Sequence, residues 1–188
     1  MRVLLIRHAE SQPNPNLPES EWPLSPAGQL QAEALIRPLE KQGAEVLYSS
    51  SFRRAIDTIK PFARAAGLPI SIKRSLRERK LTSGFHPGWK ELIRKAWDDL
   101  EFKSPGGESG LDCQARMRTR VDSLAARNPG RTIVVASHGN AIALYLNSLD
   151  NSFGWEAWAA MKNPDVFCVE YRSAGSPVWD PAFRLEAV

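Results

Sequence analysis

The sequence predicts an α/β fold, in which helices cover both faces of a central sheet. Short apolar and β-branched runs alternate along the chain with longer segments of helical periodicity, as is typical of such folds. The two most apolar runs, 3–6 and 132–136, are continuous rather than alternating, which indicates strands buried on both faces. Ligands of such sheets bind at the carboxyl ends of the strands, so the residues that follow each strand are the first candidates for a site.

The expected strands are short, and polar, glycine or proline residues bound each of them. They cover residues 1–6, 44–48, 69–72, 132–136, 166–171 and a last stretch around 183–185. Four prolines and two asparagines between residues 13 and 23 predict a loop after the first strand.

Helices are expected between these strands. The first begins at Ser25 and Pro26, because serine is a good N-cap and proline suits the first helical position. It should end near Gly43, and its apolar stripe is predicted to contain Leu30, Ala34, Leu35 and Leu39. Further helices are predicted over 52–66, 87–97, 111–127 and 141–149, followed by a helical stretch whose tryptophans, Trp155 and Trp158, should pack in the core.

Length and composition indicate an ordinary globular protein. The 188 residues predict a single domain, 1–188, and the hydrophobic fraction of 43% excludes a disordered chain. The net charge of +4 suits an anionic substrate. The lysines and arginines are spread along the chain rather than gathered in the basic stripe of a nucleic-acid-binding surface, so we expect no nucleic-acid partner.

The cysteines and the N-terminus predict a cytoplasmic location. Cys113 and Cys168 form no CxxC motif, and they predict buried thiols rather than a disulfide framework or a structural zinc site. The N-terminus lacks the basic and apolar regions of a signal peptide. Because no stretch approaches the ~18 apolar residues of a membrane span, no membrane partner is expected either.

Chemically versatile side chains follow four of the expected strands. In chain order these are Arg7 and His8, Arg53 and Arg54, Glu78, and His138 and Gly139. A parallel sheet would bring them to one edge. The chain contains only three histidines, and two of them follow the two most apolar strands.

Three kinds of site could use these residues. Two histidines and a glutamate could bind zinc, but the neighbouring arginines would repel a dication and the HExxH spacing is absent. A serine nucleophile is disfavoured because "ASHGN" lacks the GxSxG pattern. An anion site fits best, since arginine donors match phosphate oxygens and a neutral imidazole among them can attack phosphorus. A carboxyl group in reach can protonate the leaving alkoxide and later activate water.

Four blocks of the sequence resemble, in order and spacing, the histidine phosphatase superfamily, also called the phosphoglycerate-mutase-like family. They are "LIRHAESQPN", "PLSPAGQLQAEAL", "LYSSSFRRAIDT" and "VVASHGNAI". The resemblance runs from about Val3 to Ile142, and the length is similar to that of the family's short phosphatase branch. It implies a three-layer αβα sandwich with a mostly parallel central sheet, the phosphoglycerate-mutase-like fold.

The resemblance also implies a role for each site residue, without a metal or cofactor. His8 is the nucleophile that becomes phosphorylated, and Glu78 matches the family's proton donor. Arg7, Arg54 and His138 bind and stabilise the transferring phosphoryl group, and Arg54 is chosen over its neighbour because it directly precedes Ala55. Two residues complete the phosphate pocket, with a side chain from Asn14 and a backbone amide from Gly139.

The sequence departs from the family's pattern after Glu78, where it reads "RKLTSGFHPGW". This departure leaves Glu108, in "GGES", as a second candidate for the acid. It also predicts an unusual pocket wall, to which Phe85, His86 and Trp89 could contribute.

The predicted function is hydrolysis of a small phosphate ester through a covalent phosphohistidine. Three alternatives stay open. Phosphoglycerate-type mutases of the family are generally longer, and phosphohistidine-protein phosphatases typically lack an acid at the Glu78 position. The alternative from another class is a phospho-ligand sensor with weak catalysis. The sequence leaves the substrate open, and the chain could be a monomer or a homodimer.

Overall fold

The computed structural model describes residues 1–83, 87–172 and 176–185, and six strands form one mixed sheet within them. The strand order is β3-β2-β4-β1-β5-β6. Their bounds are β1 Arg2–Arg7, β2 Ala44–Ser49, β3 Ile70–Ile72, β4 Thr132–Ser137, β5 Asp165–Glu170 and β6 Val178–Asp180. Strands β3, β2, β4 and β1 run parallel, whereas β5 is antiparallel to both of its neighbours. The predicted α/β fold with a mostly parallel sheet is confirmed.

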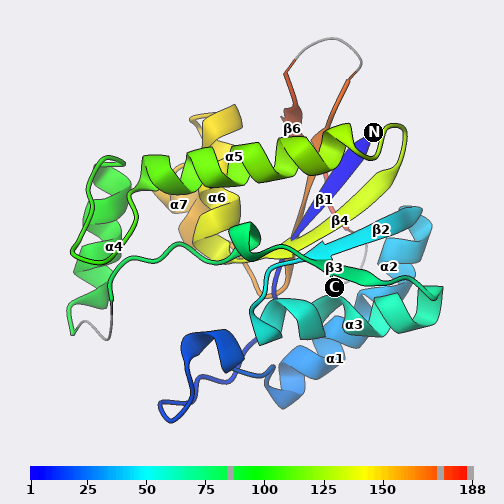
Figure 1. Cartoon of the computed structure of the whole chain (residues 1–188), viewed down its shortest axis with the longest axis horizontal. Coiled ribbons are helices and arrows are strands. Elements are labelled where there is room, and N and C mark those ends of the chain that lie inside the picture. The colour runs from blue at the N-terminus through cyan, green and yellow to red at the C-terminus, as the bar shows by residue number, and fades with distance from the viewer. Residues whose placement is uncertain (84–86, 173–175, 186–188) are drawn as a thin grey trace.

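Helices pack on both faces of this sheet (Figure 1). One face carries α1 (Pro26–Ala34), α2 (Ile36–Lys41) and α3 (Arg53–Ala66). The other carries α4 (Trp89–Asp98), α5 (Gly110–Ala126), α6 (Gly139–Leu149) and α7 (Trp155–Ala159). Two short 3-10 helices, η1 (Glu19–Glu21) and η2 (Arg74–Leu76), lie in the connections. The result is the three-layer αβα sandwich that the family resemblance implies.

Alternate residues of β1 face opposite helical layers. Val3 and Leu5 belong to the core that contains α5 and α6, whereas Leu4 and Ile6 pack with α2 and α3. All four side chains are fully buried. Burial of one such side chain contributes about 1.5–3 kcal/mol, so β1 is a rigid support for the residues that follow it.

The tryptophans and cysteines lie where the sequence predicts. Trp155 and Trp158 of α7 are partly buried, and the ring of Trp158 is 6.1 Å from that of Trp97 in α4. Cys113 and Cys168 are buried free thiols.

The predicted first helix differs from the observed one in two ways. It is divided at Leu35 into α1 and α2, because Pro38 has no N–H to donate to the carbonyl of Ala34. The predicted apolar stripe is also wrong at Leu30, which is 70% exposed, and at Ala34. Because Gly28 lies against the backbone of Glu10, its face of the helix turns inward. The buried stripe is therefore Gly28, Ala32, Leu35 and Leu39.

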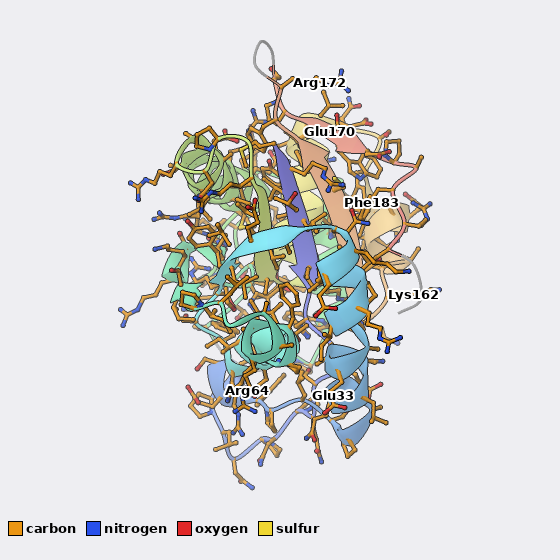
Figure 2. All side chains as sticks on the ribbon, turned by 90° about the vertical axis from the view of Figure 1, so that its right-hand side faces the viewer. Glu33, Arg64, Lys162, Glu170, Arg172 and Phe183 are labelled. Atoms are coloured by element: carbon orange, nitrogen blue, oxygen red, sulfur yellow. The ribbon has the colours of Figure 1, made fainter. Side chains whose placement is uncertain are left out.

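The last strand lies at β6, so the prediction of a strand around 183–185 is wrong. The chain turns just after β6, where Asp180 accepts hydrogen bonds from the next two available amides and Pro181 offers none. Phe183 (labelled in Figure 2) and Leu185 still pack against the core, which explains their apolar character.

The topology brings the two histidines together. Arg7 lies opposite Ser137 in the register of β1 and β4, so His8 and His138 leave the sheet side by side. Helices α3 and α6 begin just past β2 and β4, at the same edge. Figure 2 looks along α3 from the end labelled Arg64, and it shows β1 and β4 pointing toward the loop that contains η1.

Candidate active site

His8 has one protonated and one unprotonated ring nitrogen. Its Nδ1 lies 2.8 Å from the carbonyl oxygen of Ala9, and because a carbonyl only accepts, Nδ1 carries the proton. Its Nε2 accepts a hydrogen bond of 3.0 Å from Nε of Arg54. Burial, followed by the charges of Arg54 and Arg7, lowers the pKa of His8 to about 3, against a smaller opposing effect of the Ala9 hydrogen bond. A neutral imidazole with its lone pair on Nε2 is a competent nucleophile.

Arg54 begins α3 and is only 4% exposed. Besides the hydrogen bond to His8, its Nη1 donates to the carbonyl of Glu19 at 2.8 Å and its Nη2 donates to the carboxylate of Glu19 at 2.7 Å. Arg53 points elsewhere, since it is exposed and pairs with Asp57 at 3.3 Å. Of the two neighbouring arginines, only Arg54 reaches His8.

Arg7 lies against the start of α6. Its Nη1 donates to the carbonyl of Met161 at 2.8 Å, while its buried Nε has no hydrogen-bond partner among the described residues. A side chain at Gly139 would begin 3.2 Å from this Nε, so glycine gives the guanidinium room to approach the helix. Burial lowers the pKa of Arg7, but an arginine keeps its charge under all ordinary conditions. Its unpartnered donor is suited to an anionic oxygen.

His138 has the same tautomer as His8 but a different orientation. The hydroxyl of Ser50 accepts a hydrogen bond from the amide of Phe52 at 3.2 Å and lies 2.8 Å from Nε2 of His138. In the described part of the chain, Nε2 of His138 is the one acceptor within hydrogen-bond distance of this hydroxyl, so we assign the hydroxyl proton to Nε2 and the ring proton of His138 to Nδ1. This Nδ1 is buried and unpartnered in the described part of the chain. Burial, followed by the charge of Arg54, lowers the pKa of His138 well below its usual value, so the ring is a neutral donor.

Glu78 is held at the start of α6. Its Oε1 accepts hydrogen bonds from the amides of Arg79 at 2.7 Å and Ala141 at 2.9 Å, and its Oε2 accepts one from Asn140 at 3.2 Å. The first amides of a helix have no helical partner and suit a carboxyl group. Burial raises the pKa of Glu78, and these hydrogen bonds together with the charge of Arg54 oppose the shift only in part. A raised pKa lets the group carry a proton for a leaving alkoxide.

Glu108, the second candidate acid, is bound into a separate ion-pair cluster. Arg77 donates to both of its carboxylate oxygens, at 2.9 and 3.0 Å, and Arg116 donates to it from another side at 3.2 Å. Burial alone would raise the pKa of Glu108, but the hydrogen bonds and charges of Arg116 and Arg77 outweigh it and lower the pKa. Such a carboxylate gives up its proton readily, which favours Glu78 as the acid.

The other predicted pocket residues form no hydrogen bond with His8 or His138 within the described part of the chain, or are not described. The side chain of Asn14 accepts a hydrogen bond from the amide of Asn16 at 2.9 Å and so shapes its own loop. Trp89 begins α4 and is 46% exposed. Phe85 and His86 lie outside the described residues.

Three residues of the site were missed by the sequence analysis. Ser50 follows a strand, so the reasoning that selected Arg54 could also have selected it. Glu19 caps Arg54, and Asn163 donates to the carbonyl of His8 at 2.7 Å. Both residues lie in connecting segments and reach the site through tertiary contacts. No local sequence pattern predicts such contacts.

Residues 1–83, 87–172 and 176–185 contain neither a cluster of metal-ligating side chains nor a helix suited to span a membrane. No group of three or more His, Cys, Asp or Glu side chains in these ranges is placed to hold a metal ion. None of the helices in the same ranges has the length and apolar character needed to cross a membrane.

Comparisons with known proteins show the family to which this chain belongs. A sequence model described as "Histidine phosphatase superfamily (branch 1)" matches residues 3–178. A glucosyl-3-phosphoglycerate phosphatase from Mycolicibacterium vanbaalenii is 31% identical over 161 residues, which cover 76% of this chain and 71% of that protein. The "Probable phosphoglycerate mutase GpmB" of Yersinia enterocolitica is 28% identical over 160 residues, covering 79% of this chain and 74% of that protein.

A solved structure extends the similarity to the whole fold. The complex of a mycobacterial glucosyl-3-phosphoglycerate phosphatase with inorganic phosphate superposes with a TM-score of 0.78 at 27% identity. The match covers 99% of this chain and 97% of that chain.

Proposed function

We propose that this chain, which belongs to the histidine phosphatase superfamily, hydrolyses the phosphate ester of a small metabolite through phosphorylated His8. The chain is a phosphomonoester hydrolase of that superfamily, in which transfer through a phosphohistidine is general.

His8 and Glu78 carry out the two half-reactions. In the first, Nε2 of His8 attacks phosphorus, the bond from phosphorus to the ester oxygen breaks, and Glu78 gives its proton to that oxygen, so that an alcohol departs. In the second, a water molecule attacks the phosphohistidine while the carboxylate of Glu78 takes a proton from it. The bond from phosphorus to Nε2 then breaks, which restores His8 and releases inorganic phosphate.

The neighbouring donors stabilise the charge on the phosphoryl oxygens during both steps. Arg7 and Arg54 supply cationic donors, and Nδ1 of His138 supplies a neutral one. Fixed donors of this kind provide most of the catalysis in phosphoryl transfer. The amide of Gly139 and the side chain of Asn14 complete the proposed binding set.

The observation that carries the proposal is the tautomer of His8. Its proton is fixed on Nδ1 by the carbonyl of Ala9, and its Nε2 lone pair faces a phosphate-binding type of side chain, Arg54. A histidine with a purely structural role would not need the buried cation of Arg54 next to its unprotonated Nε2.

The experiment is a hydrolysis assay with an aryl phosphate and glycerol 3-phosphate in excess chelator. We expect release of inorganic phosphate to persist, because Arg7 and Arg54 supply the positive charge at the site. Complete and metal-reversible loss of activity would contradict this mechanism.

A mutase is the second candidate, favoured by the name of the Yersinia relative. It would pass the phosphoryl group from His8 to a second hydroxyl instead of to water. Incubation with 3-phosphoglycerate separates the two reactions. Isomerisation without release of phosphate supports the mutase, and release of phosphate without isomerisation supports the hydrolase.

A further inference from the structure

Glu19, in η1, covers the guanidinium of Arg54. Its carbonyl and its carboxylate accept hydrogen bonds from Nη1 and Nη2, at 2.8 and 2.7 Å. The third nitrogen, Nε, donates to His8. Nη1 and Nη2 are the terminal pair with which an arginine binds two oxygens of a phosphate. The carboxylate of Glu19 thus holds Nη2, a donor that could bind a phosphoryl group at His8, while its backbone carbonyl holds Nη1.

The loop that carries Glu19 is fixed, but the side chain of Glu19 is not enclosed. Ser11 and Leu24 pair at the base of the loop, and the indole of Trp22 donates to the carbonyl of Asn14 across it at 3.0 Å. The Glu19 side chain is 54% exposed, whereas that of Arg54 is 4% exposed. The carboxylate can therefore rotate away from Arg54 without opening a cavity, while the loop keeps it close to the site.

We propose that Glu19 is a specificity-determining residue that acts in two ways. An incoming phosphoryl group must displace its carboxylate from Arg54, which weakens the binding of every phosphate ester. The displaced carboxylate then disfavours esters whose alcohol carries a second negative charge close to the phosphate. This proposal rests on the proposed phosphatase function and narrows its substrate class.

The charge of the substrate matters because the distances are short. One guanidinium and two hydrogen bonds separate the carboxylate of Glu19 from Nε2 of His8. This separation is comparable with the Debye length of ~8 Å in physiological salt, so screening is incomplete. Repulsion between two like charges at this range changes an affinity about tenfold. The favoured substrates are phosphate monoesters of alcohols that bear hydroxyl or ammonium groups, which can donate to Glu19.

The test compares the wild-type protein with Glu19→Gln on a matched pair of esters. Glycerol 3-phosphate and 3-phosphoglycerate differ by one carboxylate. Glu21→Gln is the control, because it removes the same charge from the exposed side of the same short helix. We expect Glu19→Gln to raise kcat/KM for both esters, and to raise it about tenfold more for 3-phosphoglycerate. Glu21→Gln should change this ratio less than twofold.

Three outcomes of this assay contradict the proposal. An equal gain for both esters removes selection by charge. A loss of kcat/KM with glycerol 3-phosphate means that Glu19 holds Arg54 in its working position instead of competing for it. If the ratio of kcat/KM for the two esters changes equally in Glu19→Gln and Glu21→Gln, the effect comes from the net charge of the protein and not from the position of Glu19.

A binding measurement separates this proposal from the proposed function. Inorganic phosphate is titrated into each variant by calorimetry, without turnover. We expect Glu19→Gln to bind phosphate about tenfold more tightly than the wild-type protein, and equal or weaker binding overturns the displacement step. If the wild-type protein hydrolyses neither ester, the proposed function fails. The charge selection is then tested by the dissociation constants of glycerol 3-phosphate and 3-phosphoglycerate, compared between the wild-type protein and Glu19→Gln.

Discussion

His8 and His138 occupy equivalent places in the fold but face their surroundings differently. Each follows one of two adjacent parallel strands, and their side chains are nearly inaccessible, at 8% and 0% exposed. Each carries its proton on Nδ1. In His8 that proton is bound to the carbonyl of Ala9, and the lone pair of Nε2 accepts a hydrogen bond from the cationic Arg54. In His138 the lone pair is bound by Ser50 and the N–H remains to donate.

This difference shows that residue type and strand position do not by themselves assign a role. The partner of one ring nitrogen decides what the other nitrogen can do. The carbonyl beside Nδ1 leaves Nε2 of His8 unprotonated, whereas the hydroxyl beside Nε2 leaves Nδ1 of His138 as the donor. The following predictions test that contrast.

The largest effect is expected for His8→Ala. Because this change removes the attacking atom, we expect kcat for an aryl phosphate to fall by at least about 10⁴-fold. Circular dichroism should confirm that the variant is folded. A loss below tenfold would mean that another residue is the nucleophile.

Glu78→Gln should separate substrates by their leaving group. A general acid contributes about 10²–10⁴-fold where the leaving alkoxide is poor, so hydrolysis of an alkyl phosphate should fall by this factor. An aryl phosphate should lose far less, because its leaving group needs little protonation. Glu108→Gln is the control carboxylate, and it should leave the ratio of the two rates unchanged. Equal losses for both substrates in Glu78→Gln would place the acid elsewhere.

His138→Ala should slow the reaction without preventing phosphorylation of His8. Removing one fixed donor to a charged transition state costs about 10²–10³-fold in kcat. The phosphoenzyme should still form, more slowly, in a rapid-quench assay. Complete absence of a phosphoenzyme would mean that phosphorylation of His8 requires His138, which contradicts a role for His138 as a supporting donor.

Ser50→Ala tests the orientation of His138. One hydrogen bond contributes about 1 kcal/mol, so a loss of about five- to tenfold in kcat is expected. Ser50→Thr keeps the hydroxyl and should restore most of the activity. If both variants lose activity equally, the effect of Ser50 is packing and not the tautomer of His138.

The acid side of the stability profile should also depend on His8. The unfolded chain binds a proton to His8 below its ordinary pKa of about 6.5. The folded protein binds it only near pH 3. Between these values the unfolded state holds more protons, so the free energy of unfolding falls as the pH falls, by about 1.4 kcal/mol per unit from this group.

Urea denaturation between pH 6 and pH 4 measures this contribution. His8→Asn should lose its unfolding free energy less steeply than the wild-type protein over this range. An unchanged slope would show that His8 titrates normally in the folded state, which contradicts the neutral nucleophile.

The sequence predicted the central part of the site because that part follows from topology. Continuous apolar runs identify β1 and β4 as buried strands, and parallel strands deliver their following residues to one edge. These two observations were enough to predict that Arg7, His8 and His138 lie together. The same rule applied to β2 points to Arg54, and its separation from Arg53 came only from the family resemblance.

The remaining features depend on packing between distant segments. Leu30 looks like a core residue by periodicity, but the contact of Gly28 with Glu10 turns another face inward. Phe183 and Leu185 look like a strand, although they pack through side chains beyond a turn. Glu19 lies in a proline-rich loop that offers no periodic pattern, and its contact with Arg54 spans 35 residues.

The most direct test of the account is the identity of the phosphorylated atom. The protein is mixed with a labelled phosphate ester, quenched in base within the first turnover and digested, and the labelled peptide is examined by mass spectrometry and phosphorus NMR. The account predicts an acid-labile phosphate on Nε2 of His8, which is absent from His8→Ala. Phosphate on Nδ1 of His8, on His138 or in an acid-stable ester would contradict it.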